Sequence, residues 1–84
     1  MKYLSITVTA LDIKRGYSGT NWCPIARAVN RKFHLRNGAN TTVTHRRVYV
    51  GWRRFSMSSA GRDFVKSFDM GLPCRPFTLE LEAK

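Results

Sequence analysis

Both ends of this 84-residue chain alternate between apolar and polar residues. The apolar positions are Leu4, Ile6, Val8 and Ala10 near the start, and Phe77, Leu79 and Leu81 near the end. A period of two is the pattern of a β-strand that buries one face. We therefore expect the fold to begin and end in strands.

Two segments between these ends are typical of helices. Pro24 suits the first position of a helix, where its missing N–H costs no hydrogen bond, and the Asn37-Gly38 pair supplies an end. Ser58 and Ser59 offer N-caps for a second helix, which Gly71 ends. The apolar stripes of the two helices are Ile25, Ala28, Val29 and Phe33, and Ala60, Phe64, Val65 and Phe68.

The middle segment, residues 41–57, is rich in β-branched and aromatic residues. It predicts two short strands or one long strand that bends at Gly51. With a loop over residues 12–23, the order predicts a single α+β domain over residues 1–84. We expect an antiparallel sheet of three to four strands with two helices on one face. Two middle strands would match the β-α-β-β-α-β order of ferredoxin-like folds.

Positive charge is concentrated between Asp12 and Asp63. This stretch holds eleven Lys or Arg residues and no carboxylate, and it accounts for nearly all of the formal net charge of +10. A solvated surface normally mixes both signs, so a segment without acids indicates an anionic partner. Asp12 and Asp69 are expected to cap the backbone or to pair with an arginine inside the fold.

Residues 44–55 carry two Arg pairs with aromatic residues between them. Arginine binds phosphate oxygens in bidentate geometry, and Tyr or Trp can stack on unpaired bases. Neighbouring strand residues point to opposite faces, so one arginine of each pair can lie on a given face. The alternative is that Tyr49, Trp52 and Phe55 belong to the core, with the arginines around them.

A basic helix face extends this pattern, because its cations recur about one turn apart and could follow a phosphate backbone. The candidate nucleic-acid-binding residues are Arg27, Arg31, Lys32, Arg36, Arg46, Arg47, Tyr49, Trp52, Arg53 and Arg54. Either DNA or RNA would satisfy such contacts.

Catalysis, a cofactor and a metal site are not expected. Cys23 precedes a predicted helix start that could stabilise its thiolate, but neither His34 nor His45 is identified as its base. Cys23 and Cys74 form no C-x-x-C pair, so we expect two free thiols, with a single disulfide as the alternative in an oxidising compartment. No apolar run approaches the roughly 18 residues of a membrane span, so we expect a soluble cytoplasmic protein without a membrane partner.

Four short motifs cover both ends of the chain. They are Asp12-Ile13 with Gly16, Cys23-Pro24-Ile25-Ala26 with Ala28, Phe68-Asp69 with Gly71, and Pro76-Phe77 with Leu79 and Leu81. In this pattern the chain resembles small uncharacterised proteins encoded by bacteriophages and prophages. The resemblance implies a phage origin, and therefore the cytoplasm of an infected bacterium, but it implies no activity.

The leading hypothesis is a small phage accessory protein that binds nucleic acid mainly through phosphate contacts of an Arg-rich surface. The alternative is a protein-binding inhibitor of a host or defence complex, either anti-CRISPR-like or a host-takeover factor. Its basic surface would dock on an acidic patch or on the nucleic-acid site of a nucleic-acid-containing host complex. A virion or assembly component is a third hypothesis. The exposed edge of a terminal strand could support a homodimer.

Overall fold

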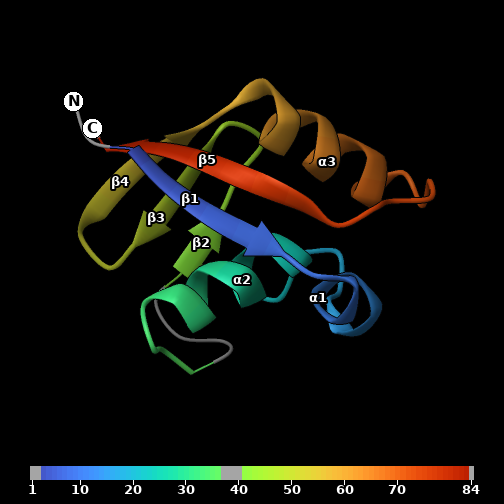
Figure 1. Cartoon of the computed structure of the whole chain (residues 1–84), viewed down its shortest axis with the longest axis horizontal. Coiled ribbons are helices and arrows are strands. Elements are labelled where there is room, and N and C mark those ends of the chain that lie inside the picture. Colours follow the sequence, from blue (N-terminus) through green and yellow to red (C-terminus); the bar gives the residue numbers. More distant parts are fainter. Residues whose placement is uncertain (1–2, 37–40, 84) are drawn as a thin grey trace.

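The structure is a computed structural model that describes residues 3–36 and 41–83. These residues form five strands and three helices (Figure 1). In chain order the elements are β1 (Tyr3–Val8), α1 (Ala10–Arg15), α2 (Pro24–Lys32), β2 (Thr41–Val43), β3 (Arg47–Val50), β4 (Arg53–Met57), α3 (Ser59–Asp69) and β5 (Phe77–Ala83). The α+β class and the strands at both ends are confirmed.

The strands form one sheet in the order β1-β5-β4-β3-β2, and every neighbouring pair is antiparallel. The described residues thus contain one or two strands and one helix more than the sequence predicted. The ferredoxin-like alternative is wrong, because its βαβ units would place parallel strands in the sheet. Here β1 and β2 lie at opposite edges.

Residues 41–57 form three strands, where one or two were predicted. The additional break separates β2 from β3 and begins at Thr44. The hydroxyl of Thr44 accepts a hydrogen bond from the N–H of Arg47 at 3.1 Å, which stabilises a turn. Gly51 and Trp52 form a two-residue turn between β3 and β4. The φ of Gly51 is 60°, a left-handed conformation that glycine adopts without strain. The glycine therefore makes a hairpin and not a bend within one strand.

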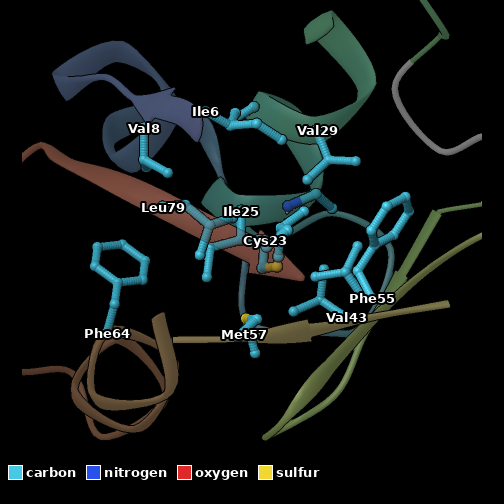
Figure 2. Close-up of a cluster of buried hydrophobic side chains, with 14 residues drawn as sticks. Ile6, Val8, Cys23, Ile25, Val29, Val43, Phe55, Met57, Phe64 and Leu79 are labelled. Atoms are coloured by element: carbon cyan, nitrogen blue, oxygen red, sulfur yellow. Dashed lines mark hydrogen bonds between the residues drawn. The ribbon is translucent and has the colours of Figure 1, made fainter. Parts of the chain in front are cut away.

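One face of the sheet is apolar and packs against the helices. The strand register brings the inward side chains together, and Leu81 lies opposite both Leu4 and Met57. α2 contacts both edge strands, β1 and β2, and α3 lies against β4 and β5. Figure 2 shows the side chains converging from the sheet and the helices. The buried apolar residues are Ile6, Val8, Cys23, Ile25, Ala26, Ala28, Val29, Val43, Val48, Phe55, Met57, Phe64, Leu79 and Leu81.

Both predicted helix starts are confirmed. Pro24 is the first residue of α2, and the thiol of Cys23 caps this helix by accepting a hydrogen bond from a backbone N–H at 3.4 Å. α3 begins directly after Ser58, which lies at the predicted N-cap position, but its hydroxyl makes no capping hydrogen bond. α2 ends at Lys32, and the predicted end at Asn37-Gly38 lies outside the described residues.

The loop predicted over residues 12–23 begins inside a short helix, α1. A capping box starts this helix, because the Thr9 hydroxyl accepts from the N–H of Asp12 at 3.2 Å and the Asp12 carboxylate accepts from the N–H of Thr9 at 2.9 Å. The prediction of a continuous loop is therefore wrong at its first residues, while the expected capping role of Asp12 is confirmed.

Candidate nucleic-acid interface

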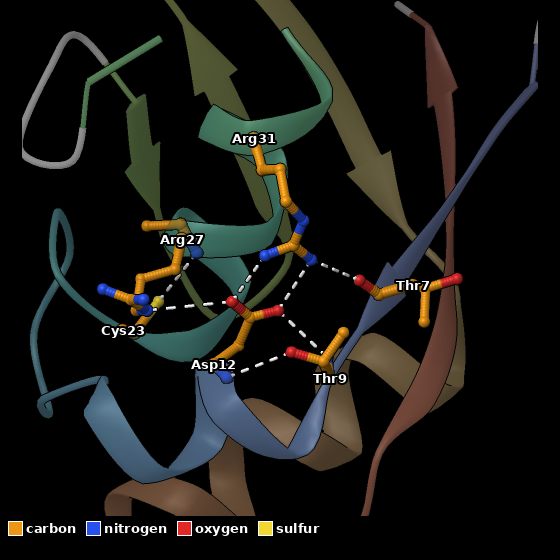
Figure 3. Close-up of polar contacts among 7 residues, drawn as sticks. Thr7, Thr9, Asp12, Cys23, Arg27 and Arg31 are labelled. Atoms are coloured by element: carbon orange, nitrogen blue, oxygen red, sulfur yellow. Dashed lines mark hydrogen bonds and ion pairs between the residues drawn. The ribbon is translucent and has the colours of Figure 1, made fainter. Parts of the chain in front are cut away.

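Asp12 lies at the centre of a polar cluster between β1, α1 and α2 (Figure 3). Arg31 binds its carboxylate through two hydrogen bonds, from Nη1 to Oδ1 at 2.7 Å and from Nη2 to Oδ2 at 2.8 Å. Nη2 also donates to the carbonyl oxygen of Thr7 at 2.9 Å. Arg27 places its Nε 3.7 Å from Oδ1. One carboxylate therefore holds two of the predicted binding arginines.

Asp12 stays charged although only 1% of its surface is exposed. Burial would raise its pKa, but the hydrogen bonds from Arg31 and Thr9 outweigh burial and hold the pKa of this carboxyl below its usual value. The hydrogen bonds between Arg31 and Asp12 also raise the pKa of Arg31. The charged cluster joins α2 to β1 and α1. This placement favours a structural role for Arg27 and Arg31.

Lys32 and Arg36 are exposed at the end of α2 and beyond it. A groove of about 480 Å³ lies nearby, between β1 and the second half of α2. Its lining residues include Arg31, Lys32 and His34. Lys32 therefore lies on the helix side of the sheet.

The remaining predicted arginines lie in or beside the β3–β4 hairpin. Arg47 and Arg54 point to the face of the sheet that the described helices leave open. Tyr49 shares this face and lies directly opposite Arg54 across the strand pair. The next residues along the strands, Val48 and Phe55, are buried on the helix side. Strand alternation thus brings two of the predicted arginines and one aromatic ring together.

Arg53 faces the helix side of the sheet. Its guanidinium carbon lies 5.2 Å from the centroid of the Phe55 ring and 5.4 Å from that of Phe33. Cation–π contacts of this kind contribute about 0.5–1 kcal/mol at exposed sites. Arg53 therefore covers one end of the core and not the open face.

Trp52 is 91% exposed in the hairpin turn, so the alternative that it belongs to the core is wrong. That alternative holds for Phe55, which is buried, whereas Tyr49 is half-buried on the open face. Arg46 is exposed in the turn before β3, at the other end of the hairpin. We call the following residues the hairpin surface: Arg46, Arg47, Tyr49, Trp52 and Arg54.

Acidic residues border the hairpin surface on one side. Glu82 of β5 lies opposite Ser56 of β4, which in turn lies opposite Arg47 of β3. Glu80 is two residues before Glu82 on the same face. Within residues 3–36 and 41–83 the ion pairs all involve Asp12, so neither Arg47 nor Arg54 has a carboxylate partner there. The open face is thus divided into a basic half and an acidic half.

Cys23 and Cys74 are free thiols, as expected. Burial raises the pKa of Cys23 and outweighs the backbone N–H groups of Ile25 and Ala26, which act in the other direction. The helix start therefore does not produce the thiolate considered from the sequence. An apolar pocket of about 280 Å³, between α3 and the start of α2, is lined in part by this buried thiol.

Among the described residues, no group of three or more His, Cys, Asp or Glu side chains is arranged to hold a metal ion. In the same part of the chain, no helix has both the length and the apolar character to cross a membrane. Comparisons with protein-family models, with curated proteins and with solved structures gave no match to this chain. A functional proposal therefore has to rest on the residues of this chain.

Proposed function

We propose that this protein binds nucleic acid, DNA or RNA, through phosphate contacts of the hairpin surface. The observation that supports this most directly is the register of β3 and β4, which sets Arg47 and Arg54 on one open face beside Tyr49. Neither arginine has a carboxylate partner in the described ranges, so both guanidinium groups are available to an external anion. Phosphate suits them, because a guanidinium fork binds two phosphate oxygens at once.

The proposed surface is narrower than the one expected from the sequence. Arg27 and Arg31 hold the buried carboxylate, and Arg53 covers the core, so we assign these three to folding. Lys32 lies on α2 and lines the groove beside β1, and Arg36 follows α2 in the chain and is not part of the hairpin. Three arginines of the hairpin surface remain for phosphate contacts.

Salt dependence tests the proposal. Each neutralised phosphate adds about 0.7 for a single strand, or about 0.9 for a duplex, to the slope of log affinity against log salt. Replacing Arg47 and Arg54 together by Gln should therefore reduce the slope by about 1.4 to 1.8 and weaken binding at low salt. Fluorescence anisotropy of labelled oligonucleotides over a salt series measures both quantities.

The matched control is the double variant Arg62→Gln with Arg75→Gln. It removes the same charge from exposed positions on α3 and before β5. The salt slope of this control variant should equal that of the wild type within experimental error. Equal loss of slope in the two double variants would mean that only overall charge matters, and no binding at low salt would contradict the proposal altogether.

We also propose that this binding serves an accessory role in the cytoplasm of an infected bacterium, the setting that the resemblance of the four motifs to phage-encoded proteins implies. The position of the gene tests this setting. A place among early or defence-associated genes would agree with it, whereas a place among structural genes would favour a virion or assembly component.

The groove beside β1 favours a second candidate function, inhibition of a host or defence complex through protein binding. Among the described residues β1 pairs only with β5, so its outer edge can add a strand from a partner. Lys32 lines the groove, and its positive charge would favour an acidic segment. A host protein that is retained after nuclease treatment, and released by Lys32→Glu, would support this function over nucleic-acid binding.

A further inference from the structure

We propose that the hairpin surface takes single-stranded nucleic acid, with bases stacked on Trp52 and Tyr49. This inference rests on the proposed function, because it names the form of nucleic acid that the same surface binds. Unpaired bases offer their faces to aromatic rings, whereas a duplex keeps these faces inside its own stack. Rings and arginines side by side therefore distinguish a single strand from a duplex, which charge alone does not.

Trp52 provides the first observation. With 91% of its surface exposed, its indole ring contributes almost nothing to the core. It sits in a two-residue turn, and the positive φ of Gly51 keeps that turn tight. A large flat ring exposed at the end of a hairpin is a surface on which a base can stack.

Tyr49 provides a second ring on the same hairpin. Arg54 lies directly across from it, and Arg47 is two residues before it on the same face. The Tyr49 ring therefore has Arg47 beside it along β3 and Arg54 opposite it on β4. From Arg46 to the turn that holds Trp52, cations and rings follow one another over about 17 Å of strand. A single-stranded nucleic acid lying along the hairpin can place its phosphates on the arginines and its bases on the rings.

The most basic of the described helices, α2, is poorly suited to reading a duplex. Helical duplex readers set an exposed helix face into the major groove. In α2, six of nine residues are buried, and Arg27 and Arg31 on its polar side hold Asp12. The described helix with the strongest basic character is thus committed to the fold.

The acidic half of the open face also argues against a duplex. Strands lie about 4.8 Å apart, so β5 is roughly 10 Å from β3. The second backbone of a duplex, about 12 Å away across the major groove, would then lie over β5 or just beyond it. On this face β5 carries Glu80 and Glu82, which repel phosphate. A single-stranded nucleic acid that follows the hairpin avoids both carboxylates.

Tryptophan fluorescence tests the inference. The chain has two tryptophans, Trp22 and Trp52, so Trp22→Phe leaves Trp52 as the reporter. Oligothymidylate of about 12 nucleotides should quench this fluorescence. It should also bind at least about fivefold more tightly than an abasic phosphodiester of the same length, because the abasic chain keeps the phosphates and loses the stacking. A blunt duplex of the same length should bind more weakly at equal salt.

Two substitutions of Trp52 separate stacking from charge. Trp52→Ala should weaken oligothymidylate binding by between about fivefold and one hundredfold and leave abasic binding unchanged. Trp52→Lys adds a cation, so a purely electrostatic surface would bind oligothymidylate more tightly, whereas a stacking surface binds it more weakly. Because Trp52 is exposed, both variants should keep the wild-type circular dichroism spectrum.

Each other outcome decides against the inference in a distinct way. Equal affinity for oligothymidylate and the abasic chain, tighter binding of the duplex, or tighter binding by Trp52→Lys would overturn the single-strand inference and leave phosphate binding in place. No binding of any of the three probes at low salt would overturn the inference and the proposed function together. Polyglutamate that quenches Trp52 as strongly as oligothymidylate would overturn the inference in favour of an acidic protein partner.

Discussion

Asp12→Asn removes the one carboxylate that Arg27 and Arg31 share. Asparagine has nearly the same size and keeps a single carbonyl oxygen as an acceptor. It cannot accept both hydrogen bonds of the Arg31 fork, and its amide group would bring further N–H donors toward the guanidinium groups. The substitution should therefore loosen the attachment of α2 to β1 and α1 without changing the shape of the core.

The expected loss is about 2–3 kcal/mol in the free energy of unfolding. Hydrogen bonds to a charged group contribute about 1.5–3 kcal/mol each, and Asp12 accepts two from Arg31 and one from Thr9. The asparagine oxygen retains part of the stabilisation that these hydrogen bonds provide. The Arg31 side chain is 52% exposed, so water replaces a further part. For a domain of this length the midpoint of thermal unfolding should fall by about 10–20 °C.

The pH dependence gives a second measure of the same cluster. The pKa of Asp12 in the folded protein is held below its unfolded value, which is about 3.9. The charged form therefore stabilises the fold above that pH, and this contribution is lost as the pH falls through the folded pKa. The difference in Tm between the wild type and Asp12→Asn should be largest near neutral pH and should shrink below about pH 4.

Thermal unfolding followed by circular dichroism at about pH 7 and about pH 3 measures both effects. Asp63→Asn is the matched control, because it makes the same change at an exposed carboxylate on α3. The control should change the free energy of unfolding by no more than about 0.5 kcal/mol. An Asp12→Asn variant that unfolds within about 3 °C of the wild type at neutral pH would refute the structural role of the cluster.

Three further experiments test packing and single-residue roles. Gly61→Ala should lower stability by about 1 kcal/mol in chemical denaturation, because overpacking outweighs the better helix propensity of alanine. The new Cβ would come 2.6 Å from Cδ1 of the fully buried Leu79, and a more stable variant would contradict this packing. Arg53→Gln should cost about 0.5–1 kcal/mol of stability and leave the salt slope of nucleic-acid binding unchanged, whereas a flatter slope would return Arg53 to the binding surface. In the native protein iodoacetamide should modify Cys74 before Cys23, since burial raises the pKa of both thiols but Cys23 is buried whereas Cys74 is only half-buried. Mass spectrometry of the labelled peptides compares the two rates, and equal rates would contradict the burial of Cys23.

Features that depend on neighbouring residues could be predicted from the sequence. Pro24 marks a helix start because its fixed φ suits the first helical position, and Ser58 occupies the N-cap position of α3 without a side-chain capping hydrogen bond. The capping box formed by Thr9 and Asp12 was equally local, with its two members three residues apart. The helix that follows it, α1, was missed because its six residues are too few to show an apolar period.

Features that depend on distant contacts could not be predicted in this way. The sheet pairs β1 with β5, the first strand with the last, and no local pattern specifies that choice. Arg31 reaches Asp12 over 19 positions of the chain, so helical spacing alone counted it as a surface cation. The placement of Arg53 over Phe33 likewise needed the packed structure, because these residues come from different elements.

The acid-free stretch therefore contains cations of two kinds, and the salt slope of the unmodified protein can tell them apart. If all eleven cations between Asp12 and Asp63 contacted phosphate, the slope would be about −8 to −10. The three arginines of the hairpin surface alone predict about −2 to −3. Addition of Lys32 and Arg36 would bring the slope to about −3.5 to −4.5. A measured slope steeper than about −5 would contradict this assignment, because it would require phosphate contacts from cations other than the hairpin surface, Lys32 and Arg36.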